Sequence, residues 1–184
     1  QGVSSAASDV YKRQGDTKNE KIWLDYIDAH NKRDLNKIAE ITSTVFYIGR
    51  LPLAPGTWCS FIAFLSWFYL RFYIEGVFIL YASLILFFIG VAVSTIHSEV
   101  IKKDDPSEIV IDEWVGQWIA LWLIPHSFYW GFASFVLFRF FDISKLGPVQ
   151  GMDDIKSGTG IMMDDVVAGI LALLVTQSLY YFIG

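Results

Sequence analysis

Apolar residues come in long blocks that contain no Asp, Glu, Lys or Arg. The blocks are residues 51–70, 76–96, 114–138 and 166–184. A bilayer core of about 30 Å requires about 20 apolar residues for one spanning helix. The second and last blocks therefore predict spanning helices. The first block also predicts one, which we expect to begin near Thr57 because Pro52 and Pro55 interrupt its start.

The third block is interrupted by Pro125 and His126 and allows two interpretations. It forms either one kinked helix or a hairpin whose arms are residues 108–125 and 127–145. Each arm would extend roughly 27–28 Å. That length could cross a bilayer if the polar end of each arm lies at the membrane edge.

The distribution of basic residues favours the hairpin. With five spanning helices and a cytoplasmic N-terminus, all of the 14 Lys and Arg residues except Arg71 fall on the cytoplasmic side. The positive-inside rule expects such a bias. We therefore predict an all-α, polytopic membrane helix bundle with about five spanning helices, including the hairpin 108–145, and a polar N-terminal segment.

The N-terminal part differs in character from these blocks. Residues 1–14 have the composition of a non-native or disordered tail, to which we assign no function. Residues 15–48 are polar and carry apolar residues at a weak helical spacing, which predicts a helical segment. The membrane-embedded domain would then comprise residues 49–184.

Composition agrees with a membrane protein. Apolar residues make up 54% of the chain and charged residues 18%, whereas soluble domains carry about 25% charged residues. The net charge of −5 and the lack of a continuous basic stripe argue against a nucleic-acid partner. Cys59 is the only cysteine, which excludes an intrachain disulfide and a cysteine-based metal site.

The hairpin would bring charged residues from separate segments to one depth. Asp112 and Glu113 precede the turn by about as many residues as Arg139 follows it, so antiparallel arms place them together at the cytoplasmic edge. Asp142 follows Arg139 at i+3 and shares its helix face. Further polar positions enter from the same side: Gly56, Thr57, Ser60, Lys145, Asp164 and Asp165.

This set of side chains suits phosphate chemistry. Carboxylate oxygens are ligands for Mg²⁺, which neutralises phosphate oxygens and activates water. Arg and Lys bind phosphate oxygens, and the backbone N–H groups of a helix that starts at Gly56 and Thr57 offer further donors. Charged groups near a bilayer are candidates for function by default.

Four stretches in this order resemble the phosphatidylglycerophosphatase A family. They are residues 51–57 (LPLAPGT), 109–116 (IVIDEWVG), 138–145 (FRFFDISK) and 160–169 (GIMMDDVVAG). The resemblance implies Mg²⁺-dependent hydrolysis of phosphatidylglycerophosphate to phosphatidylglycerol and phosphate in glycerophospholipid biosynthesis. It also implies a location in the bacterial inner membrane, with the site facing the cytoplasm. The positions that match the family's polar signature are Asp105, Asp112, Glu113, Arg139, Asp142, Lys145, Asp164 and Asp165.

We therefore predict a site with three sets of residues. The catalytic set is Asp112, Glu113, Asp142, Asp164 and Asp165. The Mg²⁺-binding set contains the same residues and Asp105. The phosphate-binding set is Arg139, Lys145, Gly56 and Thr57. We expect direct attack by water activated at the metal; the role of each carboxylate stays open, as does a covalent aspartyl-phosphate route.

Other functions would use the same residues. A small ion or proton transporter also needs intramembrane acids, but transporters place them near the midplane between repeats, and we detect no repeat here. A scaffold with a degenerate site is a further alternative, because residues 145–148 read Lys-Leu-Gly-Pro where the family carries Lys-Pro-x-Pro, so that Leu146 replaces a proline.

Plainer explanations also exist for single residues. Arg139 could pair with Glu113, and Thr57 could be a helix N-cap. Gly116 and Gly169 would then serve only close helix packing.

Overall fold

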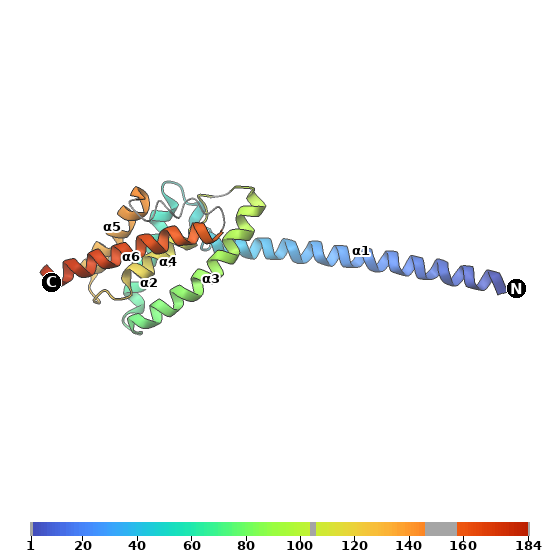
Figure 1. Ribbon diagram of the computed structural model, residues 1–184, viewed down its shortest axis with the longest axis horizontal. Coiled ribbons are helices and arrows are strands. Elements are labelled where there is room, and N and C mark those ends of the chain that lie inside the picture. The colour runs from blue at the N-terminus through green and yellow to red at the C-terminus, as the bar shows by residue number, and fades with distance from the viewer. Residues whose placement is uncertain (1, 104–105, 146–157, 184) are drawn as a thin grey trace. The chain divides into compact units, whose positions relative to one another are not determined.

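The computed structural model describes residues 2–103, 106–145 and 158–183, and these residues form helices and connecting turns without a strand (Figure 1). In chain order the elements are α1 (Gly2–Ser43), the short 3-10 helix η1 (Ile48–Arg50), α2 (Pro55–Leu70), α3 (Gly76–Ile101), α4 (Ile111–Leu121), α5 (Phe128–Ser144) and α6 (Gly158–Ile183). The prediction of an all-α fold is confirmed for the described residues.

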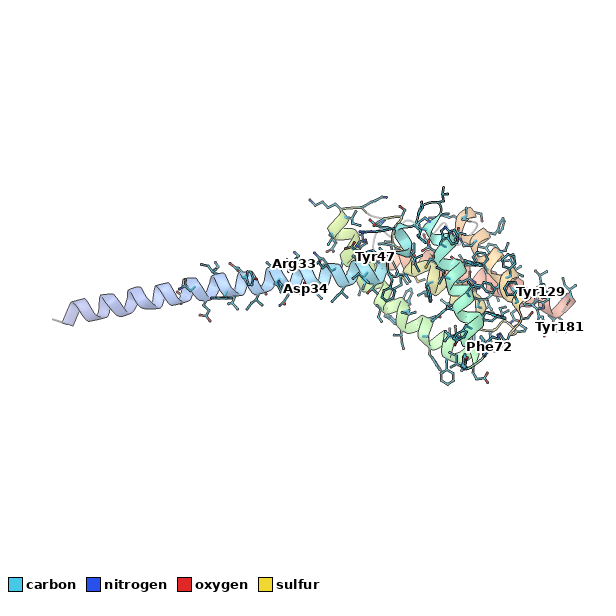
Figure 2. The ribbon with its side chains drawn as sticks, turned by 180° about the vertical axis from the view of Figure 1, so that it is seen from behind. Arg33, Asp34, Tyr47, Phe72, Tyr129 and Tyr181 are labelled. Carbon is cyan, nitrogen blue, oxygen red and sulfur yellow. The ribbon has the colours of Figure 1, made fainter. Side chains whose placement is uncertain are left out.

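The chain divides into two compact units, residues 1–37 and 38–184. In the first unit α1 carries exposed side chains, among them Arg33 and Asp34 (Figure 2). The helix also includes residues 2–14, where the sequence predicted a disordered or non-native tail.

The second unit is built around α4. This helix contacts α2, α3, α5 and α6, and residues 115–121 are all buried. It has 11 residues and is about 16 Å long, so it is shorter than the predicted arm 108–125. The helix ends at Leu121, and Pro125, four residues later, has no N–H to donate to the Leu121 carbonyl oxygen.

Helices α4 and α5 form the predicted hairpin. The Ser134 hydroxyl on α5 donates to the carbonyl oxygen of Ala120 at 2.9 Å. A Cβ placed on Gly116 would lie 2.7 Å from Cε2 of Phe138. Both pairs are symmetric about residue 127, so the two helices are antiparallel. The alternative of a single kinked helix over this block is wrong.

Two glycines bring α4 and α6 into backbone contact. A Cβ on Gly169 would overlap the Gly116 carbonyl oxygen, and a Cβ on Gly116 would lie 2.5 Å from the carbonyl oxygen of Asp165. Such close approach is typical of helix pairs with small residues at the interface. The contact places Asp165 beside the first half of α4.

Among the described helices, α3 and α6 are long and apolar enough to cross a membrane, with mean hydropathies of 2.6 and 2.0. An exposed apolar face on α3 fits contact with lipid: Phe78, Tyr81, Ile85 and Phe88 are more than half exposed and lie at helical spacing. The five predicted spanning helices are not all of this length, since α2 has 16 residues and α5 has 17.

Helix α2 begins at Pro55, two residues before the predicted start. Ala54 occupies the N-cap position, and a proline suits the first helical position because its missing N–H needs no partner there. Thr57 is therefore inside the helix and is not its N-cap.

Candidate active site

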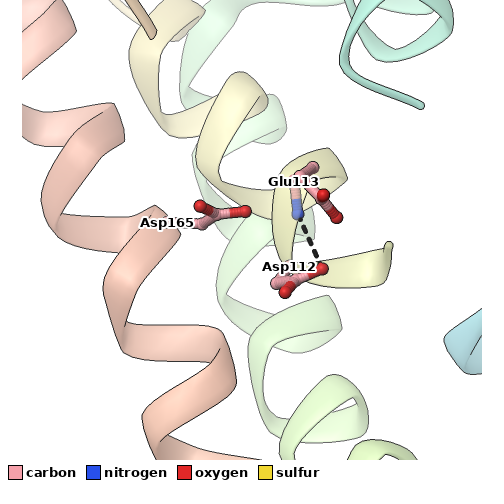
Figure 3. Close-up of side chains that lie close together, drawn as sticks. All are labelled: Asp112, Glu113 and Asp165. Atoms are coloured by element: carbon pink, nitrogen blue, oxygen red, sulfur yellow. Dashed lines mark hydrogen bonds between the residues drawn. The ribbon is translucent and has the colours of Figure 1, made fainter. Parts of the chain in front are cut away.

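Three carboxylates from two helices lie close together in the second unit (Figure 3). Asp112 and Glu113 belong to the first turn of α4, and Asp165 is directed toward them from α6. One oxygen from each carboxylate lies within 4.8 Å of those of the other two. Asp112 Oδ1 accepts a hydrogen bond from the Glu113 backbone N–H at 3.0 Å.

The start of α4 is fixed from two sides through Val110. Its N–H donates to the carbonyl oxygen of Ser43 at the end of α1, at 2.9 Å. Its carbonyl oxygen accepts a hydrogen bond from the thiol of Cys59 on α2, at 3.0 Å. These contacts hold the residue that precedes the helix, and so they determine where Asp112 and Glu113 project.

Glu113 lies against the first turn of α2. A Cβ placed on Gly56 would overlap Oε1 of Glu113, so only a glycine fits there without a shift of the carboxylate. The backbone predicted to bind phosphate at Gly56 and Thr57 is thus next to a carboxylate. The positive end of a helix dipole stabilises a negative charge in this position.

Arg139 on α5 pairs with a carboxylate of its own helix and also contacts a hydroxyl group on α2. Its Nη1 lies 2.5 Å from Oδ2 of Asp142, one helical turn away. The same Nη1 donates to the Ser60 hydroxyl at 3.4 Å, and Ser60 in turn donates to the carbonyl oxygen of Gly56 at 2.8 Å. The ion pair of Arg139 is therefore with Asp142, and the alternative pairing with Glu113 is not the one observed.

Lys145 and Asp164 form a second cation–carboxylate pair. The Lys145 ammonium lies 3.6 Å from Oδ2 of Asp164. Lys145 is the C-cap residue of α5, in left-handed backbone conformation, and Asp164 lies near the start of α6. The pair joins the ends of α5 and α6 on the side where Asp165 is located.

The structure thus brings together most of the predicted site residues, in three groups. Asp112, Glu113 and Asp165 form the carboxylate cluster, Asp142 pairs with Arg139, and Asp164 pairs with Lys145. Asp105 lies outside the described residues, as do Leu146 and Gly147.

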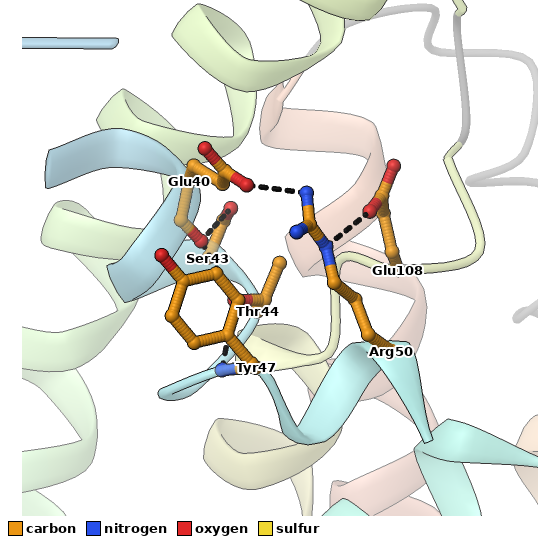
Figure 4. A network of polar contacts seen from close by, with 6 residues as sticks. All are labelled: Glu40, Ser43, Thr44, Tyr47, Arg50 and Glu108. Carbon is orange, nitrogen blue, oxygen red and sulfur yellow. Dashed lines mark hydrogen bonds and ion pairs between the residues drawn. The ribbon is translucent and has the colours of Figure 1, made fainter. Parts of the chain in front are cut away.

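Two features near the site were not recognised in the sequence. One is a polar network that joins the end of α1 to the loop before α4 (Figure 4). In it, Arg50 Nε pairs with Oε2 of Glu108 at 3.2 Å, and Arg50 Nη2 pairs with Glu40. The other is Gln117, a fully buried amide on α4. Its position four residues after Glu113, inside an uncharged block, was the available signal.

A helical protein with a carboxylate cluster and nearby Arg and Lys residues has the side chains that phosphate chemistry requires, and comparison with known proteins gives the family. The sequence profile of the family described as phosphatidylglycerophosphatase A matches residues 41–180. The chain therefore belongs to the phosphatidylglycerophosphatase A family and is a phosphoric monoester hydrolase of lipid metabolism.

Three bacterial relatives illustrate the range of names among similar proteins. A protein of Bacteroides thetaiotaomicron named "Putative phosphatidylinositol-3-phosphatase" is 36% identical over 150 residues, which cover 78% of this chain and 94% of the relative. The phosphatidylglycerophosphatase A of Escherichia coli K12 is 34% identical over 145 residues, covering 76% and 79%. That of Haemophilus influenzae is 36% identical over 140 residues, covering 74% and 85%. No solved structure matches the chain.

Proposed function

We propose that this protein hydrolyses phosphatidylglycerophosphate to phosphatidylglycerol and phosphate in an Mg²⁺-dependent reaction of glycerophospholipid biosynthesis. The observation that carries the proposal is the carboxylate cluster of Asp112, Glu113 and Asp165, with one oxygen of each within 4.8 Å. It stands beside two cation–carboxylate pairs in a chain of the phosphatidylglycerophosphatase A family.

The cluster fits a hard divalent cation. Three carboxylates at this separation repel one another unless positive charge lies between them. Oε2 of Glu113 is buried and has no hydrogen-bond partner among the described residues, so this oxygen retains the capacity to bind a cation. Carboxylate oxygens are the ligands that Mg²⁺ prefers. Asp112, Glu113 and Asp165 would hold the ion, which when bound supplies charge that stabilises phosphate oxygens and activates water.

The flanking cations would hold the phosphate group. Arg139 offers five N–H donors in a planar fork, and Asp142 and Ser60 engage only its Nη1 in the contacts given above. Lys145 adds a point charge beside Asp164. We infer that Arg139 orients the phosphate and that Asp142 fixes the guanidinium for this purpose. Asp105, Asp142 and Asp164 remain candidate metal ligands.

One observation favours a second lipid phosphomonoester as a candidate substrate. The Bacteroides relative is named "Putative phosphatidylinositol-3-phosphatase". The match covers 94% of that relative, compared with 79% and 85% of the other two. Both lipids carry a phosphate ester on a headgroup hydroxyl, so the same site chemistry would serve either. The two substrates must therefore be compared directly.

We further propose that helices α2 to α6 traverse the bacterial inner membrane, with the carboxylate cluster at the cytoplasmic edge. The apolar lengths of α3 and α6 support this topology, as does the placement of basic residues. Helix α4 is short, but it is enclosed by four other helices and need not match the bilayer thickness by itself. The lipid would then enter sideways from the cytoplasmic leaflet.

The test is release of phosphate in detergent micelles from each of the two lipids, with Mg²⁺ or with EDTA. We expect Mg²⁺-dependent release by the wild type and a loss of at least about 10²-fold in Asp165→Asn. Asp34→Asn makes the same chemical change at an exposed position of α1 and should retain full activity. If folded wild-type protein releases no phosphate from either lipid, the proposal is wrong, and ion flux in proteoliposomes would test the transporter alternative.

A further inference from the structure

Gln117 is a buried polar side chain on the helix that carries two of the clustered carboxylates. It is 0% exposed. Neither its Oε1 nor its Nε2 has a hydrogen-bond partner among the described residues. An amide can form up to about four hydrogen bonds, and buried polar atoms are nearly always satisfied by protein, ordered water or a ligand. A partner other than the described side chains is therefore expected.

The helical register places this amide next to the carboxylate cluster. Gln117 follows Glu113 by four residues on α4, so the two side chains are neighbours on one helix face. Glu113 contacts α2 at Gly56, and Trp118 donates to the Ala63 carbonyl oxygen of the same helix at 3.1 Å. Gln117 lies between these two contacts in sequence, on the part of α4 that packs along α2.

Two other polar atoms around this interface share the same property. Oε2 of Glu113 and Nε of Arg139 are buried and lack a hydrogen-bond partner among the described residues. Arg139 reaches the same stretch of α2 through Ser60. The junction of α2, α4 and α5 therefore holds an acceptor on Glu113, a donor on Arg139 and the Gln117 amide, which can both donate and accept. A buried water molecule typically makes about three hydrogen bonds to such atoms.

We propose that Gln117 holds a water molecule beside the Glu113 carboxylate and that this water is the reactant consumed in hydrolysis. The inference rests on the proposed phosphatase function. An apolar bundle offers few places where water can be kept in a defined orientation, and this amide supplies one next to the carboxylates.

The chemistry is balanced with water as the co-substrate. The water oxygen forms a bond to phosphorus while the ester P–O bond breaks. One proton of the water passes to the carboxylate cluster and is returned to the leaving headgroup oxygen, which yields the lipid alcohol and inorganic phosphate. The amide exchanges no proton in this sequence, so Gln117 is a positioning residue.

A purely structural amide would behave differently on substitution. Replacing an unsatisfied buried amide by an apolar side chain of similar size removes its desolvation penalty and stabilises the protein. Replacing an amide that binds a reactant water lowers turnover without affecting the binding of the lipid. The variant Gln117→Met separates these cases, and Gln177→Met is the matched control, because the Gln177 amide donates to the Leu123 carbonyl oxygen beyond the far end of α4.

The experiment measures kcat, KM and Tm in detergent with Mg²⁺, together with the ratio of alkyl phosphate to inorganic phosphate when methanol is added. For Gln117→Met we expect kcat to fall at least about tenfold with KM within about twofold, no rise in Tm, and a higher share of alkyl phosphate because water no longer has a fixed position. Gln177→Met should keep the wild-type kcat and product ratio. Gln117→Asn, which keeps an amide one methylene shorter, should be intermediate and replaces the Met variant if that does not fold.

An unchanged kcat together with a higher Tm in Gln117→Met would overturn the water site. If the wild type itself releases no phosphate, the proposed function fails separately. The Tm comparison then still tests whether the amide has a bound partner, since a raised Tm would contradict it.

Discussion

Gly56 in the first turn of α2 and Glu113 in the first turn of α4 are in direct contact, so that a Cβ on the glycine would overlap a carboxylate oxygen of the glutamate. This relationship joins two of the sequence stretches that resemble the family. It indicates that the glycine is required for the position of Glu113 rather than for backbone freedom alone.

Gly56→Ala should therefore displace Glu113 and lower kcat on the order of 10²-fold, the loss expected from a displacement of about 1 Å in a catalytic group. The measurement is steady-state phosphate release with protein of confirmed fold. Gly131→Ala is the matched control, because its added Cβ would meet the rings of Trp67 and Phe64 away from the carboxylates. Full activity in Gly56→Ala would show that Glu113 does not need its observed position.

Gly116→Ala and Gly169→Ala should each destabilise the protein by about 1–3 kcal/mol, because the added methyl separates α4 from α6. The two glycines meet at one contact, so the double variant should lose less stability than the two single losses combined. Unfolding in a mild detergent measures all three values. Strict additivity would mean that the two helices do not share this contact.

Asp165→Asn should change stability in opposite directions with and without Mg²⁺. In EDTA the variant should be more stable than the wild type by about 1 kcal/mol or more, because one of three close carboxylates, which repel one another when ionised, is replaced by a neutral amide. With Mg²⁺ at about 100 times its dissociation constant, the wild type should gain about 2.7 kcal/mol and the order should reverse. Thermal unfolding with and without the ion checks this.

The control for that reversal is Asp34→Asn, whose carboxylate is exposed and lies on α1. It should respond to Mg²⁺ as the wild type does. An Asp165→Asn protein that Mg²⁺ stabilises as strongly as the wild type would remove Asp165 from the metal-binding set.

Arg50→Gln should have a small effect, although Arg50 pairs with both Glu40 and Glu108. The Arg50 side chain is half exposed, and exposed ion pairs contribute about 0–1 kcal/mol. We expect a stability loss below about 1 kcal/mol and an unchanged kcat, because Val110 is held independently by Ser43 and Cys59. The double variant Arg50→Gln with Glu108→Gln gives the coupling energy, and a large coupling would show that this network positions α4.

The hairpin and the approach of the charged residues could be predicted from the sequence. Pro125 interrupts an apolar block, and Asp112, Glu113 and Arg139 lie at similar distances on either side of it. An antiparallel turn then determines which residues share one end. Close helix packing at Gly116 and Gly169 could also be predicted, since small residues mark close helix approach. That the two glycines contact each other is shown only by the structure.

The remainder depends on contacts that no local pattern encodes. Arg50 and Glu108 are 58 residues apart in the chain, and neither stands in a periodic pattern that points to the other. The end of α4 at Leu121 could not be predicted, because the uncharged block continues through the turn to Phe138. Hydropathy shows that such a block is buried or in lipid, but it does not show whether its neighbours are lipid chains or other helices.

The enclosure of α4 by four helices has a consequence for the way the enzyme responds to its surroundings. In the proposed topology α3 and α6 contact lipid, and a change of their tilt accommodates a thicker or thinner bilayer. Asp165 is held beside the helix that carries Asp112 by the backbone contact between α4 and α6 at Gly116 and Gly169, which is a contact between two protein helices. Acyl-chain length should then alter how the substrate reaches the carboxylates and leave the distances between them unchanged.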